Sequence, residues 1–408
     1  MINTIVRHKL TLGEKLDLMR HDARFDVADN DAPWDLAAIR EGIKAPPPPA
    51  KAPKIFLSNE CAFNCAYCGC RATNDTKRGY TIPPKELAEL AVNSANATGQ
   101  GIFITSAVCR NADYTGELVL ETIKTIRQNL WYRGYIHAKI MPGADEELIR
   151  RTGLYADRLS INIEVAKSEG YKHIARNKNK DNILKPMGQI SRLIAEKGNF
   201  KRFATSAVTQ IMAGSTGESD REIVNLSSSL YRKFGLSRIY FTPFQYQNPA
   251  RGYADLSPAQ IPTWRAKRLY QADWLLRLYG FTSEEITPEA EPNLVDDLDP
   301  KAAWALRNIH LYPIEINTAE KDLLLRIPGI GITYAARIIK ARKYCTITHD
   351  VLKNLGVSLY RSRHFLTCDG KYEGAKCENL VDYRKLLRRP LSTFDTDADV
   401  LHSVSCCV

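Results

Sequence analysis

Short apolar segments alternate with helical segments through the middle of the chain, and this alternation constrains the fold more than any other feature. Segments with the character of buried strands occur at 54–57, 101–104, 135–140, 158–165, 203–211 and 238–241. Helical patterns lie between several of them, at 87–97, 118–130 and 146–151. Strands that alternate with helices predict an α/β fold with a parallel sheet, here six β/α units of a partly open barrel.

Three cysteines directly follow the first of these strands. They are Cys61, Cys65 and Cys68, in the spacing C-x3-C-x2-C. A loop this short can present three thiolates to one cubane iron–sulfur cluster, and it leaves the fourth iron without a protein ligand. An open metal position is typical of a catalytic site. In a parallel barrel the chemistry lies at the carboxyl ends of the strands, which is where this loop falls.

A zinc site is the competing interpretation, because Cys70 offers a fourth thiol. The step from Cys68 to Cys70 is tight for a tetrahedral site, and the sequence has no second ligand pair at zinc spacing. We therefore predict a cluster loop with Cys70 outside the ligand set. Cys109 is expected to be a buried thiol. Four cysteines near the C-terminus are too scattered to favour a second cluster: Cys368, Cys377, Cys406 and Cys407.

A second motif of a different kind follows Asn317. Residues 317–320 have the form of an Asn-x-x-Glu capping box, which predicts a helix with Leu323, Leu324 and Ile327 on its apolar face. The next four residues are Pro328, Gly329, Ile330 and Gly331, and a second helix is predicted from about Thr333. Glycines allow consecutive backbone N–H groups to face outward at a helix N-terminus, where a phosphate fits.

Basic side chains on the second helix strengthen this interpretation: Arg337, Lys340, Arg342 and Lys343. The candidate nucleic-acid contacts are therefore Pro328, Gly329, Ile330, Gly331, Arg337 and Lys340. Such a hairpin binds backbone phosphate and reads no bases, so it does not choose between DNA and RNA. An ordinary helical hairpin with a glycine turn is the plain alternative. A weaker hairpin is predicted at 355–358, with Arg361 and Arg363 nearby.

The rest of the chain is divided by composition. We expect a helical extension and Pro-rich linker at 1–50, the barrel at 51–255, a helical connector or lid at 256–310, a helix–hairpin–helix domain at 311–370, and a tail at 371–408. No apolar run has the length of a membrane span, and no signal-peptide core is visible, so we expect a cytoplasmic protein. Its ten cysteines then indicate thiols and metal ligands. The net charge of +11 favours a polyanionic partner.

With both motifs, the chain resembles the DNA modification/repair radical SAM protein family, whose genes tend to lie beside a uracil-DNA-glycosylase-like gene. Further segments carry the resemblance: 15–19, 134–137, 153–158, 185–188, 270–276, 298–308 and 365–372. It implies a partial (β/α)6 radical SAM barrel with a C-terminal all-α helix–hairpin–helix domain. It also implies a [4Fe-4S] cluster, S-adenosylmethionine, and a reductant such as flavodoxin or ferredoxin. The expected partners are DNA and a uracil-DNA-glycosylase-like protein, with no membrane.

Radical SAM proteins place cofactor contacts at strand ends, and the resemblance assigns some of them here. Asn162 and Glu164 match the polar positions that hold the ribose or methionine part. Ile211 and Gly214 belong to the fifth-strand motif whose backbone meets the adenine. The second strand ends in Thr105 and Ser106 instead of the family's Gly-Gly-Glu, so either side chain would have to replace that contact. The full set of candidate cofactor contacts is Tyr67, Thr105, Ser106, Asn162, Glu164, Ile211 and Gly214.

The resemblance thus implies an enzyme that cleaves S-adenosylmethionine reductively to methionine and a 5′-deoxyadenosyl radical. The radical would be used to modify or repair DNA. No catalytic residue beyond the cofactor site is predicted. His137 and Lys139 alternate on the third strand and are candidates for facing the cavity, and a core histidine is the equal alternative. Two other functions stay open: an RNA-modifying enzyme, and a non-catalytic DNA-binding protein with a structural cluster. The latter would be expected to have four cysteine ligands.

Overall fold

The computed structural model describes residues 54–74, 79–196, 198, 202–244, 262–375, 377 and 379–388, together with Glu14 and Leu18. Two compact units divide the chain. The barrel unit comprises residues 1–33, 49–217 and 230–260, and the helical unit comprises 34–48, 218–229 and 261–408. Most of the expected N-terminal extension and linker lies outside the described residues, as do Cys406 and Cys407.

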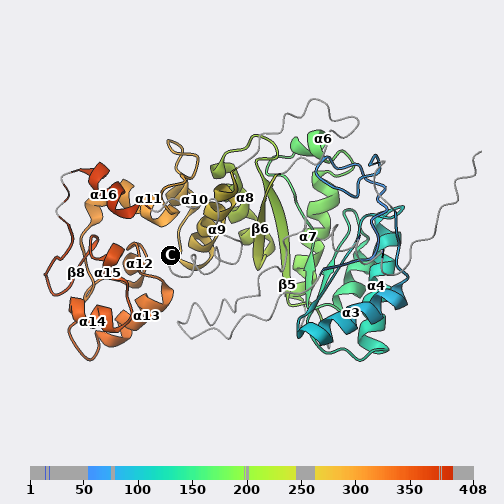
Figure 1. The fold of residues 1–408 in the computed structure, drawn as a ribbon, viewed down its shortest axis with the longest axis horizontal. Helices are drawn as coiled ribbons and strands as arrows, with labels where there is room; N and C mark the ends of the chain where they lie inside the picture. Colours follow the sequence, from blue (N-terminus) through green and yellow to red (C-terminus); the bar gives the residue numbers. More distant parts are fainter. Residues whose placement is uncertain are drawn as a thin grey trace, which may run out of the picture. The chain divides into compact units, whose positions relative to one another are not determined.

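Six parallel strands form the sheet of the barrel unit, in the order β1-β2-β3-β4-β5-β6 (Figure 1). The strands are β1 (Lys54–Phe56), β2 (Ile102–Thr105), β3 (Ile136–Lys139), β4 (Arg158–Ser160), β5 (Ser206–Ala213) and β6 (Arg238–Pro243). The helices of this unit are α3 (Pro84–Thr98), α4 (Ala112–Gln128), α5 (Glu146–Gly153), α6 (Gly170–Ile174) and α7 (Lys180–Ala195), and α8 (Asp220–Phe234) is divided between the two units. Sequential parallel strands with helices between them confirm the predicted six-stranded partial barrel.

The start of α4 and the end of β4 differ from the predicted boundaries, through a helix cap and a change of backbone conformation. Helix α4 begins six residues before the predicted Leu118, because Asn111 caps it by accepting the Tyr114 N–H at 2.8 Å. Strand β4 ends at Ser160, earlier than predicted. The chain reaches Glu164, whose φ of 64° is left-handed, and joins β5 there only through a single bridge to Ile211.

The core of the sheet is apolar and continuous. All four residues of β2 are buried, and Phe103 packs with Val208 and Tyr240. His137 belongs to this core: its ring stacks on Phe103 with centroids 3.9 Å apart, and its Nε2 lies 2.7 Å from the Ser160 hydroxyl. Of the two alternatives for His137, a residue facing the cavity or a core histidine, the structure shows the core histidine. The Ser160 hydroxyl satisfies its ring nitrogen.

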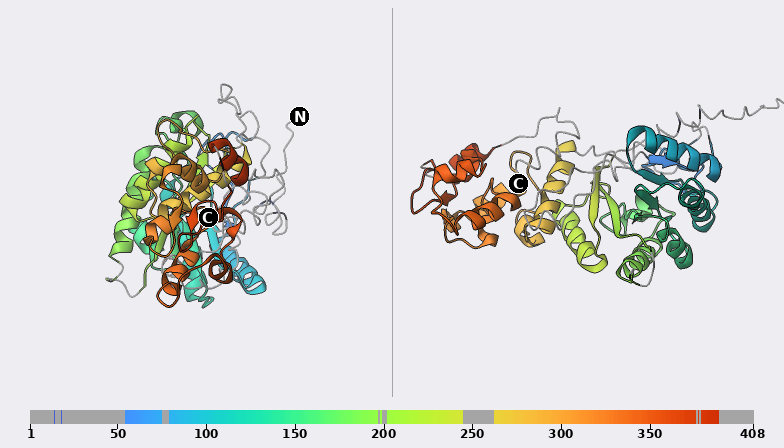
Figure 2. Two further views of the ribbon diagram at one scale, coloured as in Figure 1. Left: turned by 90° about the vertical axis from the view of Figure 1, so that its left-hand side faces the viewer. Right: turned by 90° about the horizontal axis from the view of Figure 1, so that it is seen from below.

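The helical unit contains the C-terminal helices, coloured yellow to red in Figures 1 and 2. They are α9 (Thr263–Leu278), α10 (Ser283–Ile286), α11 (Pro300–Arg307), α12 (Lys321–Leu324), α13 (Ile332–Ala341), α14 (His349–Asn354), α15 (Leu359–Ser362) and α16 (Leu380–Leu387). Two short strands, β7 (Ile314–Glu315) and β8 (Leu366–Thr367), pair in parallel and were not predicted. The predicted helical C-terminal region is otherwise confirmed.

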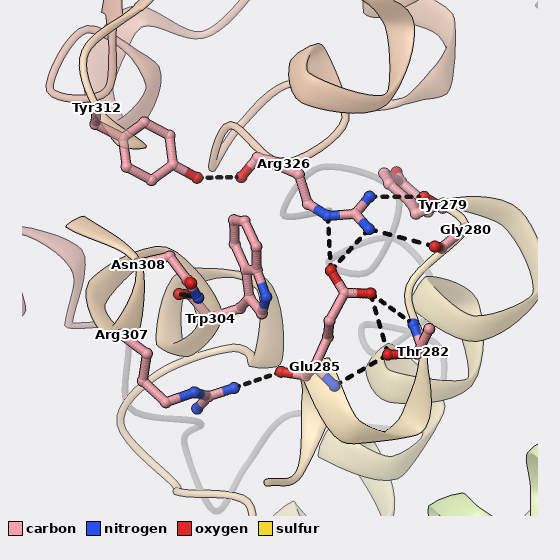
Figure 3. A network of polar contacts seen from close by, with 9 residues as sticks. All are labelled: Tyr279, Gly280, Thr282, Glu285, Trp304, Arg307, Asn308, Tyr312 and Arg326. Atoms are coloured by element: carbon pink, nitrogen blue, oxygen red, sulfur yellow. Dashed lines mark hydrogen bonds and ion pairs between the residues drawn. The ribbon is translucent and has the colours of Figure 1, made fainter. Parts of the chain in front are cut away.

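Arg326 joins the described part of the predicted connector to the hairpin region (Figure 3). Its guanidinium donates to Glu285 Oε1 at 2.8 Å and to the Tyr279 carbonyl at 3.2 Å. It lies 3.9 Å from the ring centroid of Phe281, and its own carbonyl accepts the Tyr312 hydroxyl at 2.8 Å. The Arg326 guanidinium thus contacts an aromatic ring, a carboxylate and a carbonyl at the same time. These contacts make Arg326 the junction between the two segments.

Candidate functional site

A cavity of about 340 Å³ opens at the carboxyl ends of the strands of the barrel unit. Every strand, or the loop directly after it, contributes to its wall: Phe56, Thr105, Lys139, Asn162, Gln210, Met212 and Thr242. Eight predicted residues also line it together: Cys61, Cys65, Tyr67, Cys68, Thr105, Ser106, Asn162 and Glu164. The parallel order of the strands thus brings one cavity to the place where barrels of this kind perform chemistry.

Two predicted cofactor residues lie outside this wall. Ile211 is fully buried, and it pairs through its backbone with Glu164. Gly214 follows the end of β5. Of the two alternating residues on β3, Lys139 lines the cavity and His137 does not.

Backbone hydrogen bonds hold the cysteine loop at the rim. The Ala62 N–H donates to the Val108 carbonyl at 2.8 Å, just beyond β2, and the Ala66 N–H donates to the Ile174 carbonyl at 2.8 Å, at the end of α6. The Phe63 N–H donates to Cys61 Sγ at 3.3 Å. The loop is therefore fixed by contacts distant in sequence, whereas its ligand spacing is purely local.

The three thiols have different acidities. Burial raises the pKa of Cys65 to about 12, and burial also raises that of Cys61. The Cys70 thiol donates a hydrogen bond to Cys68 and lowers the pKa of Cys68 to about 7. Cys70 is buried and supports a neighbouring thiolate, which is compatible with its predicted place outside the ligand set.

Within the described part of the chain, no three His, Cys, Asp or Glu side chains are already arranged as a metal site. The three cysteines share one cavity wall without surrounding a single point. Metal sites commonly form together with metal binding, because the ligands must lose protons and converge. The donor set is thus three thiols on one short loop, of the kind that iron–sulfur clusters require.

Lys178 is the main site residue that sequence reasoning missed. Its Nζ donates to Glu164 Oε1 and to the Tyr67 hydroxyl, each at 3.0 Å. The side chains of Lys178 and Glu164 are only 11% and 5% exposed. Burial would lower the pKa of Lys178, but Glu164, Cys65 and Cys68 together outweigh it and the pKa is raised. Only its position just before the Asn179 cap of α7 marks this lysine in the sequence.

Three buried oxygens in the cavity wall have no partner among the described residues: Asn162 Oδ1, Glu164 Oε2 and the Thr242 hydroxyl. Backbone bonds hold Glu164 in its left-handed conformation, with its N–H on the Gln210 carbonyl at 2.9 Å and its carbonyl on the Met212 N–H at 2.7 Å. Unpaired buried acceptors are costly, so a ligand with hydroxyl or ammonium donors would satisfy them. The ribose and amino groups of S-adenosylmethionine are donors of this kind, so the residues fit that cofactor.

At the end of β2 the Ser106 hydroxyl donates to the Ala107 carbonyl at 2.7 Å and lies 3.9 Å from Cys109 Sγ. Cys109 is a buried thiol, as expected. Thr105 is buried and lines the cavity beside it. Both hydroxyl residues thus occupy the strand end where the resemblance expects a contact to the cofactor.

The hairpin of the helical unit begins α13 at Ile332, with Gly331 as the N-cap. Gly329 has φ 90°, which only glycine adopts without strain, and Ile330 is fully buried beneath it. The predicted capping box is wrong. The Asn317 side chain donates to the Ile347 carbonyl at 3.0 Å and accepts the Ile347 N–H at 2.7 Å, and α12 begins later, at Lys321.

The predicted cations divide into two groups. Lys340 and Lys343 are exposed, and Arg337 is exposed while it donates to the Leu355 carbonyl at 2.9 Å. Arg342 donates to the Ala319 carbonyl at 2.6 Å, and Arg361 is buried in an ion pair with Asp299. Arg342 and Arg361 therefore stabilise the fold.

A second glycine turn joins α14 to α15 at Gly356, whose φ is 87°. The two turns pack reciprocally. A Cβ at Gly329 would lie 3.5 Å from the Ser362 nitrogen of α15, and a Cβ at Gly356 would lie 3.5 Å from Arg337 Nη1 of α13. A Cβ at either position would make only ordinary van der Waals contact, so the left-handed φ, and not a lack of space, favours glycine at both turns.

Comparisons with known proteins agree with these two regions. Residues 55–229 match the radical SAM superfamily, and residues 312–347 match the helix-hairpin-helix motif. No curated protein matches the chain. None of the described helices has the length and apolar character needed to cross a bilayer.

Several solved structures align with part of the chain. A HydG, described as a maturase of the [FeFe]-hydrogenase, aligns at TM-score 0.42 with 15% identity, over 56% of this chain and 49% of its own. HydG from Carboxydothermus hydrogenoformans aligns at TM-score 0.44 with 13% identity, over 74% and 80%. The radical S-adenosylmethionine methyltransferase TsrM from Kitasatospora setae aligns at 0.34 with 15% identity, over 46% and 35%. The chain spans about half the length of the first of these structures.

Proposed function

We propose that this radical SAM enzyme, which uses a [4Fe-4S] cluster and S-adenosylmethionine, acts on DNA that its helix–hairpin–helix binds. The observation that carries the proposal is the presence of both regions in one chain. The barrel unit supplies a cofactor cavity, and the helical unit supplies a Gly329–Gly331 turn at the N-terminus of α13. The radical SAM domain bears out the predicted enzyme class and its cofactors.

In the cofactor site, we assign the cluster to Cys61, Cys65 and Cys68, and the polar groups of S-adenosylmethionine to Asn162 and Glu164. The bound pair supplies a reductive cleavage of the cofactor's sulfonium. The protein's own contribution is to bind and orient: Lys178 holds the Glu164 carboxylate through one oxygen and leaves the other for the ligand. Apolar side chains such as Met141 and Met212 line the same cavity and keep water from it.

In the helical unit, a DNA phosphate would bind the backbone N–H groups of Gly329 and Gly331, at the positive end of the α13 dipole. The exposed Lys340 and Lys343 would approach neighbouring phosphates, and the net charge of +11 would favour the encounter. A target nucleotide must leave the base stack before it can enter a cavity of about 340 Å³. The reaction would modify or repair that nucleotide.

The radical chemistry is tested by anaerobic reconstitution of the cluster, followed by dithionite and S-adenosylmethionine. We expect 5′-deoxyadenosine to form, and its rate to rise when duplex DNA is added. An intact cluster without any 5′-deoxyadenosine would instead indicate a DNA-binding protein with a structural cluster. A stimulation by RNA that duplex DNA does not produce would indicate an RNA-modifying enzyme.

The hairpin is tested by the double variant Gly329→Asp, Gly331→Asp, which places carboxylates where the phosphate would bind. Salt-sensitive duplex binding should be lost while the cluster spectrum stays unchanged. Unchanged binding would remove the hairpin from the proposal. Pull-down experiments with a uracil-DNA-glycosylase-like protein, and reduction by flavodoxin or ferredoxin in place of dithionite, would test the two proposed partners.

A further inference from the structure

A buried lysine reaches the back of the hairpin. Lys301 on α11 is only 1% exposed, and its Nζ donates to the Ile330 carbonyl at 2.5 Å. The same Nζ lies 4.9 Å from the ring centroid of Tyr279, whose hydroxyl lies near the Ile332 backbone. Two side chains from outside the hairpin therefore lie beside the backbone on either side of Gly331, and Lys301 holds it by a hydrogen bond.

The hydrogen bond from Lys301 to the Ile330 carbonyl also fixes the direction of the Gly331 N–H, which belongs to the same peptide unit. The Ile330–Gly331 peptide is trans, since the single cis bond in the described chain is Tyr312–Pro313. In a trans peptide the C=O and the following N–H point in opposite directions. Because Lys301 holds the Ile330 carbonyl, the N–H of Gly331, which is itself a buried residue, points to the side away from Lys301. No described residue accepts a hydrogen bond from that N–H.

We propose that Lys301 is a positioning residue for nucleic-acid binding, which aims the Gly331 N–H at the bound phosphate by holding the Ile330 carbonyl. The inference rests on the proposed DNA binding and assigns a new role to the segment predicted as a connector. Tyr279 would support the same arrangement, because its ring lies against the Lys301 ammonium group and its hydroxyl lies near the Ile332 backbone.

The cost of burying this amine supports a conformational role. Burial lowers the pKa of Lys301 well below its usual value, and the nearby Asp299 carboxylate only partly offsets the effect. Asp299 is itself engaged by Arg361. A buried amine with one carbonyl as its hydrogen-bond acceptor is a poor source of stability, and an apolar side chain of similar length often serves stability as well. What the apolar side chain cannot do is orient the peptide.

Lys301→Met tests the proposal, because methionine keeps the length and loses the donor. Binding of a fluorescein-labelled DNA duplex is followed by anisotropy at several salt concentrations. We expect Kd to rise about tenfold, with a salt slope equal to that of the wild type, since no exposed cation has been removed. Lys343→Met is the matched control: it removes an exposed charge, so its slope should fall by about one.

Hydrogen–deuterium exchange supplies a readout that does not depend on DNA. Amide exchange at residues 329–332 should increase in Lys301→Met and in Tyr279→Phe, while the melting temperature stays close to that of the wild type. Because both side chains hold one hairpin, the two substitutions together should weaken binding by less than the product of their separate effects.

The outcomes separate this inference from the proposed function. Wild-type binding by Lys301→Met, with loss of binding by the Gly329/Gly331 double variant, would overturn the positioning role and leave the hairpin in place. Wild-type binding by Lys301→Met, by Tyr279→Phe and by the Gly329/Gly331 double variant would overturn the proposed function of the hairpin. Should Lys301→Met not fold, Tyr279→Phe decides: unchanged binding and unchanged exchange in that variant would overturn the proposal.

Discussion

Lys178 and Glu164 form a buried ion pair with 3.0 Å between Nζ and Oε1, and this pair connects the cysteine loop to the wall of the barrel cavity. Lys178 lies just before α7, Glu164 follows β4, and the lysine's second bond reaches Tyr67 in the cysteine loop. The ammonium group thus links Tyr67, 111 residues away in the chain, to Glu164 and the start of α7. Backbone hydrogen bonds to Gln210 and Met212 hold Glu164 in its left-handed conformation.

Lys178→Met should therefore destabilise the barrel unit and weaken cofactor binding. Removal of one partner leaves Glu164 as an unpaired buried charge, a change that costs about 3–5 kcal/mol. Urea unfolding would measure the loss, and anaerobic equilibrium dialysis would measure binding of S-adenosylmethionine. Lys178→Met combined with Glu164→Gln should regain most of the stability but not the affinity. A stable single variant with normal affinity would contradict the role given to the pair.

Substitution of the cysteines should separate ligands from neighbours. Cys61→Ala, Cys65→Ala and Cys68→Ala should each prevent reconstitution of a cluster with about four irons per chain. Cys70→Ala is the matched control and should keep the cluster, because its thiol supports Cys68 only by a hydrogen bond. Iron content and the visible absorbance of the cluster provide the measurement. Loss of the cluster in Cys70→Ala would indicate that Cys70 is a ligand. It would favour a site with four cysteine ligands, as in the competing zinc interpretation.

The low pKa of Glu315 predicts that the helical unit loses stability in acid. Its burial opposes ionisation, but N–H donors from Gly370 and Asn317 outweigh it and lower its pKa to about 2, from an ordinary value of 4.5. A depressed carboxyl pKa stabilises the folded state above pH 4.5, and this contribution is lost as the pH falls toward 2. Glu315→Gln should therefore lower stability at neutral pH by about 1–2 kcal/mol, and the difference from wild type should vanish near pH 2.

Thermal unfolding at a series of pH values tests this expectation. The control is Glu320→Gln, since Glu320 is exposed and makes no side-chain capping bond to α12. A constant difference between wild type and Glu315→Gln at every pH would show that the charge of Glu315 contributes nothing.

Arg326→Lys should destabilise the helical unit although it conserves the charge. A lysine cannot reproduce the planar contacts with Phe281 and Trp304. Nor can it make the bonds to both Glu285 and the Tyr279 carbonyl that Figure 3 shows. We expect a loss of about 2–4 kcal/mol in denaturant unfolding, in the range of a broken buried network. Arg363→Lys, at an exposed position, is the comparison and should change stability little. Equal stability of the two variants would contradict the junction described for Arg326.

Much of the architecture could be predicted because it depends on local patterns. The apolar runs of β1 to β6 reflect the burial of parallel strands on both faces, so their number and order were readable. The same holds for the cysteine spacing and for the Pro328–Gly331 turn, whose residue types follow from ligand geometry and backbone freedom. The Asn317 capping box failed because the side chain found a partner 30 residues away, at Ile347, in place of its own helix.

Only the tertiary structure decided which polar groups meet. Lys178 and Tyr67 are 111 residues apart, and Lys301 and Ile330 are 29 apart. No periodicity in the sequence marks such pairs, because the partner is chosen by how strands and helices pack and by the need to satisfy buried polar groups. Arg361 illustrates the same point: its sequence suggested a phosphate contact, and packing placed it on Asp299 instead. The sequence by itself thus determined the cluster loop, the barrel and the hairpin, and tertiary packing decided which side chains hold them in working positions.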